Sequence, residues 1–258
     1  MRNDTRKETD LFNSDEAATF KTGREMTRKV IVNFSGGKDS TVAILETLKR
    51  YPKEEIVLLY ENTGAEYLET PEHVQKIAHM LDLPLFEQKP KLDFWDNSKK
   101  FKQFPRPDSR FCTWILKQDV VRHWVASNRD MFGDEIIVVT GLRAEESAAR
   151  AKLGEWSIDN HLTTKNQTVK FWAPVLQMKK QEVFERIEAE GLPLHPAYEF
   201  ASRLSCWCCI FGKYNEVRTY AEMHPDLYEQ ACLVEDEIKH KWKLNFGFND
   251  LMKQGRLF

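Results

Sequence analysis

The chain has 258 residues, of which 41% are apolar and 30% are charged. These proportions are typical of a soluble globular protein with one large domain, or one domain with a small appendage, and they exclude collagen-like, mucin-like and wholly disordered chains. Its 38 basic and 40 acidic side chains give a formal net charge of −2. Any polyanion must therefore be bound by a local basic patch.

The sequence indicates a cytoplasmic protein without a membrane partner. Residues 1–29 mix both signs of charge and lack the apolar core of a secretory signal. No apolar run approaches the ~20 residues that span a bilayer. In a reducing compartment the cysteines are not expected to form disulfides, and three of them fall within the four positions 206–209. Such crowding points to metal or sulfur chemistry.

The apolar pattern predicts an α/β fold with a doubly wound, mainly parallel sheet of about five strands. Continuous β-branched runs at 30–34, 56–60 and 136–140 indicate strands buried on both faces, and 84–88 and 168–172 are further predicted strands. Amphipathic helical stripes lie between the runs, which predicts right-handed crossovers. Residues 179–190 are a predicted helix closed by Gly191.

Three parts are expected along the chain. Residues 1–25 form a polar N-terminal arm, residues 26–200 form the α/β domain, and residues 201–258 form a helical segment that contains the cysteine cluster.

A glycine-rich loop follows the first predicted strand. It consists of Ser35, Gly36, Gly37, Lys38, Asp39 and Ser40, and a predicted helix begins directly after it. A helix N-terminus at the carboxyl edge of an open sheet offers unpaired N–H groups and a partial positive charge, which suits phosphate. The glycines admit the anion, Lys38 adds a cation, and Asp39 would cap the helix or bind Mg²⁺. The alternative is a plain Gly-Gly turn before a serine-capped helix; the spacing is not that of a Walker loop.

A second polar motif follows the run at 136–140. Gly141, Arg143 and Arg150 belong to it, and Arg143 is expected on the same rim as the glycine-rich loop, where a guanidinium binds phosphate bidentately. Glu145 and Glu146 are expected to interact favourably with a helix N-terminus or to hold the arginines, rather than to act as acid and base. A solvated arginine–glutamate helix face is the alternative.

The cysteines form a candidate metal site. Cys206 and Cys209 are a C-x-x-C pair that can face one ion from a tight turn, and Cys112 can supply a third thiolate, which suits zinc or iron–sulfur. His195 would complete a Cys₃His zinc site. Cys208 is a fourth ligand, a persulfide carrier or a buried neighbour, and a buried structural role is expected for Cys232.

Residues 91–111 interleave basic and aromatic side chains. This pattern suits stacking on unpaired bases together with phosphate pairing. The alternative is an ordinary loop whose aromatic side chains pack inward.

The glycine-rich loop resembles the SGGxDS loop of the adenine nucleotide α-hydrolase-like enzymes, also called N-type ATP pyrophosphatases. Two segments narrow the resemblance to the phosphoadenosine phosphosulfate reductase group. Residues 62–64 resemble its DTG segment, with Asn62 in the aspartate position, and 141–150 is similar to its G-[IL]-R-x-x-[EQ]-S-x-x-R motif. The resemblance implies adenine nucleotide binding by the whole loop with Thr63, Gly64, Gly141, Arg143 and Arg150, and cleavage at the α-phosphate or the sulfate attached to it.

The same resemblance implies an iron–sulfur site. Cluster-containing sulfonucleotide reductases place a Cys-Cys pair before this motif and a C-x-x-C pair after it to bind a [4Fe–4S] cluster. Thr113 replaces the second cysteine here, so ligation is carried over to Cys112, Cys206 and Cys209 only. Three ligands leave one iron open, and in related ATP-dependent tRNA thiolases such an iron is thought to hold sulfide.

The expected function is an ATP-dependent sulfur transferase that uses ATP, Mg²⁺ and a [4Fe–4S] cluster. It adenylates an acceptor with pyrophosphate release, and sulfur then displaces AMP; the expected acceptor is a nucleic acid and the expected sulfur donor a protein. The predicted catalytic residues are Lys38, Asp39, Arg143 and Cys208. Two alternatives stay open: a sulfonucleotide reductase, and a non-catalytic, metal-stabilised nucleic-acid-binding protein.

Overall fold

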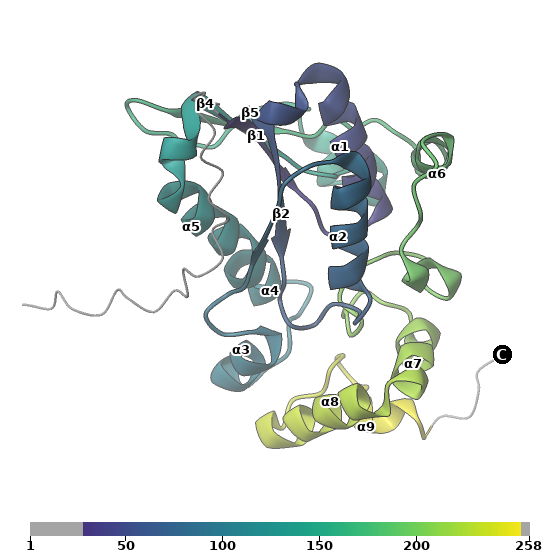
Figure 1. Cartoon of the computed structure of the whole chain (residues 1–258). Coiled ribbons are helices and arrows are strands. Elements are labelled where there is room, and N and C mark those ends of the chain that lie inside the picture. Colours follow the sequence, from purple (N-terminus) through teal and green to yellow (C-terminus); the bar gives the residue numbers. More distant parts are fainter. Residues whose placement is uncertain (1–27, 254–258) are drawn as a thin grey trace, which may run out of the picture.

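A six-stranded sheet forms the centre of the protein, seen here in a computed structural model that describes residues 28–253 (Figure 1). The predicted arm over 1–25 lies outside the described residues. The strands are β1 (Arg28–Asn33), β2 (Ile56–Glu61), β3 (Leu85–Gln88), β4 (Phe132–Val139), β5 (Trp156–Ile158) and β6 (Thr168–Trp172). Their order is β3-β2-β1-β4-β6-β5, and every neighbouring pair is parallel except β5 and β6.

The predicted doubly wound, mainly parallel sheet is confirmed, with one strand more than expected. Strand β5 has only three residues and no apolar run, so nothing in the sequence signals it. It is held at the sheet edge by the pairing of Trp156 with Trp172, whose rings stack with centroids 5.0 Å apart.

Helices cover both faces of the sheet (Figure 1). Helices α1 (Lys38–Arg50), α2 (Thr70–Leu81) and α6 (Lys180–Ala189) pack on the face that presents Val30, Val32 and Leu58. Helix α5 (Asp119–Ser127) packs on the opposite face. Because side chains alternate along a strand, wholly apolar strands are required to fill both of these cores.

A third core carries the cysteines beyond one end of the sheet (Figure 1). It is built by α3 (Phe94–Phe101), α4 (Phe111–Thr113), α7 (Tyr214–Met223), α8 (Pro225–Ile238) and α9 (Phe248–Leu251). Trp207, Tyr220 and Trp242 are buried at its centre. This core therefore draws on residues both before and after position 200.

Short helical turns complete the fold. The 3₁₀ turns are η1 (Lys53–Glu55), η3 (Arg129–Met131), η4 (Ala144–Glu146), η5 (Arg150–Lys152) and η6 (Pro196–Glu199), and η2 (Trp114–Gln118) is a π-helical segment between α4 and α5. Among residues 28–253 no helix is long and apolar enough to cross a bilayer.

Candidate functional site

A cavity of about 830 Å³ opens beyond the carboxyl ends of β1, β2, β4 and β6. Of the residues predicted to bind nucleotide, it is lined by Ser35, Gly37, Lys38, Asp39, Ser40, Gly141, Arg143 and Arg150. Gly36, Thr63 and Gly64 are not among the lining residues. The structure thus brings the two polar motifs together at one site, as expected when neighbouring parallel strands end at the same edge.

The glycine-rich loop turns at Gly36 and begins α1 at Lys38. Gly36 has a φ of +76°, and a Cβ there would lie 3.0 Å from Cγ1 of Val74, so this position requires glycine. Gly37 has an ordinary φ of −79°. Its carbonyl oxygen accepts hydrogen bonds from the hydroxyls of Ser40 (2.9 Å) and Thr41 (3.0 Å), which fixes the first turn.

Gly141 brings the second motif against that first turn. A Cβ at Gly141 would lie 2.6 Å from the backbone nitrogen of Ser40 and 2.8 Å from the carbonyl oxygen of Asp39. Neither backbone atom can move without distorting α1. The contact therefore leaves no room for any side chain at this position.

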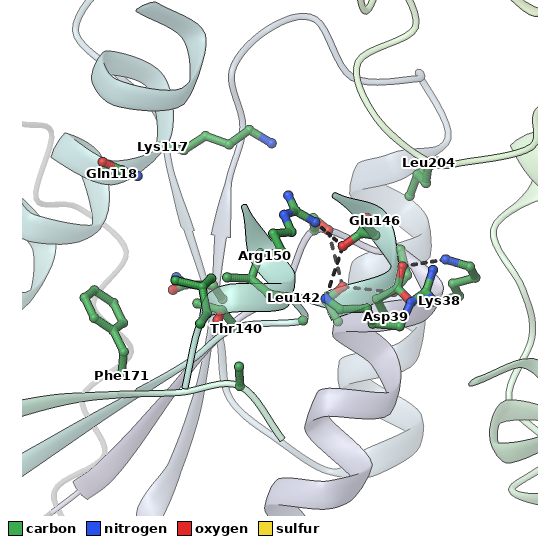
Figure 2. A pocket seen from close by; sticks show the side chains of 18 of the residues that line it. Lys38, Asp39, Lys117, Gln118, Thr140, Leu142, Glu146, Arg150, Phe171 and Leu204 are labelled. Carbon is green, nitrogen blue, oxygen red and sulfur yellow. Dashed lines mark hydrogen bonds and ion pairs between the residues drawn. The ribbon is translucent and has the colours of Figure 1, made fainter. Parts of the chain in front are cut away.

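Asp39 links the two motifs electrostatically (Figure 2). Its Oδ2 lies 2.5 Å from Nζ of Lys38, and its Oδ1 lies 2.5 Å from Nε of Arg143. The Lys38 and Arg143 residues are 5% and 4% exposed, so the pairing offsets the cost of burying two cations. Glu145 pairs with Arg143 and Glu146 pairs with Arg150, so both glutamates hold arginines as expected.

Two polar side chains at the strand ends were not predicted as site residues. Glu61 ends β2, lines the cavity and is 6% exposed, and its Oε1 has no hydrogen-bond partner among the described residues. Asn33 ends β1, and its buried Oδ1 likewise has no hydrogen-bond partner within residues 28–253. Burial raises the pKa of Glu61 to about 7, although the charge of Lys117 acts in the opposite direction. The sequence did contain a signal for Glu61, because a glutamate directly follows the continuous apolar run 56–60.

Lys117 connects the cavity with the cysteines. It lies in the π-helical segment η2, and its side chain extends toward the cavity that it lines (Figure 2). Burial alone would lower the pKa of Lys117, but the charges of Cys206, Glu66, Glu61 and Cys112 together raise it. In the sequence, Lys117 lies within an amphipathic helical pattern, and nothing there marks it as a site residue.

The three predicted ligand thiols act on one another through their charges. Burial raises the pKa of Cys112, and the charge of Cys209 raises it further. The pKa of Cys206 is raised mainly by burial, with contributions from Cys209 and Cys112. However, across residues 28–253 no three His, Cys, Asp or Glu side chains form a group arranged to hold a metal ion. The structure therefore brings these thiols near one another without forming a closed ligand set.

Cys208 has a different environment. It is 1% exposed in the third core, burial raises its pKa well above the usual value, and its carbonyl oxygen accepts a hydrogen bond from Nε1 of Trp242 (2.7 Å). This placement favours its interpretation as a buried neighbour over that of a persulfide carrier. Cys232 is half-buried on α8.

His195 does not complete a zinc site in this structure. It is 1% exposed, its Nδ1 accepts a hydrogen bond from the backbone nitrogen of Ala197 (3.1 Å), and its Nε2 lies 3.0 Å from Oγ1 of Thr70. Both ring nitrogens are therefore engaged. Burial lowers its pKa to about 4, which keeps the ring neutral. The role of His195 here is to join α2 to η6.

Most of the segment 91–111 does not form the stacking surface that the sequence suggested. Four of its aromatic side chains are buried in the third core: Phe94, Trp95, Phe104 and Phe111. Phe101 alone among its aromatics is exposed, at 40%. Inward packing therefore describes most of this segment.

Residues 29–211 match the phosphoadenosine phosphosulfate reductase domain. The chain belongs to this family. An uncharacterized protein of Methanocaldococcus jannaschii is 26% identical over 228 residues, covering 88% of this chain and 45% of its own length. An uncharacterized protein of Escherichia phage 186 is 30% identical over 162 residues, covering 62% of this chain and 46% of its own length. The chain thus spans about half the length of these relatives.

Two solved structures are similar to this chain at low sequence identity. The phosphoadenylyl-sulfate reductase of Candida auris has a TM-score of 0.50 and 16% identity, covering 70% of this chain and 82% of that one. The U34-tRNA thiolase NcsA of Methanococcus maripaludis, solved with its [4Fe–4S] cluster, has a TM-score of 0.48 and 17% identity, covering 90% of this chain and 74% of that one.

The Gly141 contact generates a direct test of the site. We expect Gly141→Ala to abolish ATP binding, because its Cβ would push the second motif away from the first turn of α1. Gly133→Ala is the matched control on β4, since a Cβ there meets no atom within 4 Å. Isothermal titration with ATP checks both variants, and equal affinities would contradict the importance of this contact.

Glu61 generates a pH-dependent stability prediction. Its folded pKa of about 7 lies above the ordinary value of 4.5. Ionisation is therefore penalised in the folded state, and the stability contributed by the neutral form is lost as pH rises through about 7. We expect Glu61→Gln, which cannot ionise, to match the wild type below pH ~4.5 and to exceed its free energy of unfolding by about 3 kcal/mol at pH ~9. Urea unfolding across this range would refute the prediction if the difference stayed constant.

Proposed function

We propose that this protein binds ATP in the cavity, transfers the adenylyl group to an oxygen of its acceptor with release of pyrophosphate, and then lets sulfur displace AMP. The observation that carries the proposal is the junction of the glycine-rich loop with Arg143 through the Gly141 contact. This junction supplies a helix N-terminus and two buried cations at one wall of a nucleotide-sized cavity.

The chain's own residues would serve the adenylation step through charge. The acceptor oxygen attacks the α-phosphorus, the bond from that phosphorus to the bridging oxygen breaks, and its electron pair leaves with pyrophosphate. Lys38 and Arg143 would stabilise the negative charge that develops on the phosphates, and Asp39 holds both cations in place. Tyr198 Oη accepts a hydrogen bond from the backbone nitrogen of Lys38 (3.1 Å), which steadies the loop from the other side.

Magnesium is the expected partner of the nucleotide, and Asp39 is the carboxylate of the loop. Both of its oxygens are hydrogen-bonded to cations, so the loop offers Mg²⁺ no free carboxylate. The phosphate charge is therefore met here by Lys38 and Arg143.

The sulfur step would involve Cys112, Cys206 and Cys209. Their three thiols come from two segments, take part in no disulfide and are partly exposed, a donor set that suits a [4Fe–4S] cluster. When bound, such a cluster would supply an iron that accepts a sulfur ligand. Lys117, between these thiols and the cavity, would stabilise anionic sulfur on its way to the adenylated acceptor.

A sulfonucleotide reductase is the second candidate, because the matched domain carries that name. It would use the same cavity to bind adenosine phosphosulfate, with or without a 3'-phosphate, and, with two electrons from an external dithiol, would release sulfite and AMP or its 3'-phosphate. The product distinguishes the two reactions, since only the first releases pyrophosphate.

The reaction test uses anaerobically purified protein with ATP, sulfide and unfractionated RNA. We expect pyrophosphate release, and we expect Arg143→Lys to slow it on the order of 100-fold, because a point charge cannot reproduce the guanidinium fork. Arg186→Lys is the control, since that arginine pairs with Glu46 and Glu190. Sulfite release from adenosine phosphosulfate, without pyrophosphate release from ATP, would replace the proposal by the reductase.

The thiols are tested by metal analysis. We expect about four iron atoms and four labile sulfides per chain, lost in the serine variants of Cys112, Cys206 and Cys209 and retained in Cys232→Ser. Cys208→Ser should also retain them, since that thiol lies in the apolar core. Stoichiometric zinc without labile sulfide would contradict the cluster.

A further inference from the structure

The exposed aromatic side chains of this protein share an unusual feature. Within residues 28–253 four aromatic residues are at least 40% exposed: Phe101, Trp114, Phe211 and Tyr214. Each has a cation over its ring. Lys100 lies 5.7 Å from the centroid of Phe101, Arg122 lies 5.1 Å from that of Trp114, Arg110 lies 5.8 Å from that of Phe211, and Lys243 lies 4.2 Å from that of Tyr214.

A ring contact, a hydrogen bond and chain adjacency link these four pairs. The ring of Phe101 lies 5.3 Å from that of Phe111, which directly follows Arg110 and precedes Trp114 by three positions in the chain. Lys243 Nζ donates a hydrogen bond of 2.6 Å to the carbonyl oxygen of Gly212, which directly follows Phe211. Helix α3, which carries Lys100 and Phe101, and α7, which begins at Tyr214, lie at the same end of the molecule (Figure 1), whereas Trp114 and Arg122 belong to the run of η2 and α5. We call these four aromatic–cation pairs the aromatic track.

The aromatic track borders both the thiols and the cavity. Cys112 lies between Arg110 and Trp114 in the chain, and the backbone nitrogen of Gly212 donates a hydrogen bond to the carbonyl oxygen of Cys209 (2.8 Å). At its other end Arg122 lines the cavity. A molecule lying along the track would therefore pass beside the sulfur site and reach the nucleotide.

We propose that the aromatic track binds an unpaired polynucleotide strand. Exposed rings stack on base faces, and the paired cations neutralise phosphates, so the combination matches a strand whose bases are unstacked. RNA and DNA share both groups, whereas a duplex hides its base faces. The track retains cationic character although Asp119 lies 3.8 Å from Arg122. This inference rests on the proposed function, and it identifies the acceptor of that reaction as an unpaired polynucleotide.

The track replaces the segment 91–111 as the candidate nucleic-acid surface. That segment contributes Phe101, Lys100 and Arg110, while its other aromatic side chains are buried. The remaining members come from η2, α5 and the C-terminal part of the chain. Sequence proximity alone could not have collected them.

The test is fluorescence anisotropy with labelled oligouridylate and oligothymidylate of about 16 nucleotides, and with a hairpin duplex of equal length. We expect both single strands to bind more tightly than the duplex. The double variant Phe211→Ala/Tyr214→Ala and the single variant Trp114→Ala should each weaken single-strand binding at least tenfold. Leu233→Ala and Met223→Ala, which remove exposed aliphatic side chains outside the track, should leave it unchanged. Thermal melting confirms that each variant folds.

The outcomes separate this inference from the proposed function. Unchanged single-strand affinity in the folded track variants, equal loss in the controls, or duplex binding as tight as single-strand binding would each overturn the aromatic track. Arg110→Gln should also reduce the slope of log affinity against log salt concentration by about one counterion. An unchanged slope would likewise contradict the aromatic track. Intact strand binding without pyrophosphate release would overturn the adenylation chemistry while leaving the track in place.

Discussion

The close approach of Gly141 to the first turn of α1 is the constraint on which the candidate site depends. Strands β1 and β4 are parallel neighbours, so the loops that follow them leave the sheet at the same edge. Only an absent side chain lets these backbones lie within reach of each other, because a Cβ at Gly141 would come within 2.6 Å of the Ser40 nitrogen. Two motifs that are about 100 positions apart thereby share one set of charges.

The charges at this junction indicate which partner an incoming phosphate would replace. Asp39 lies between Lys38 and Arg143, and removing it would leave two nearly buried cations side by side. Glu145 is exposed and pairs with the same arginine from the solvent side. Exchanging Glu145 for phosphate keeps every buried charge paired, whereas exchanging Asp39 does not. The guanidinium is thus held by one partner and available to a second.

The sequence predicted those parts of the fold and site that depend on local pattern. Buried strands, the loop at a helix N-terminus and the arginine on a neighbouring strand follow from apolar runs and polar motifs. Strand β5 was missed because its pairing depends on tryptophan stacking at the sheet edge. Glu61 and Lys117 were missed because their roles arise from facing elements. For Cys208 and the aromatic residues of 91–111, a suggestive residue type did not reveal that packing buries the side chain.

One helical run joins the parts of the site that differ most in chemistry. From Phe111 to Ser127 the chain passes through α4, the π-helical η2 and α5, and it carries Cys112, Lys117 and Arg122 in that order. A π-helical segment adds a residue to the turn and rotates everything after it, which is why such segments are common at functional sites. Here Lys117, within that segment, lines the cavity, while Cys112, which precedes it, is close enough to Cys209 for that charge to raise its pKa. Because the run is continuous, one helical stretch carries the thiol of Cys112, the ring of Trp114 and the cation of Lys117.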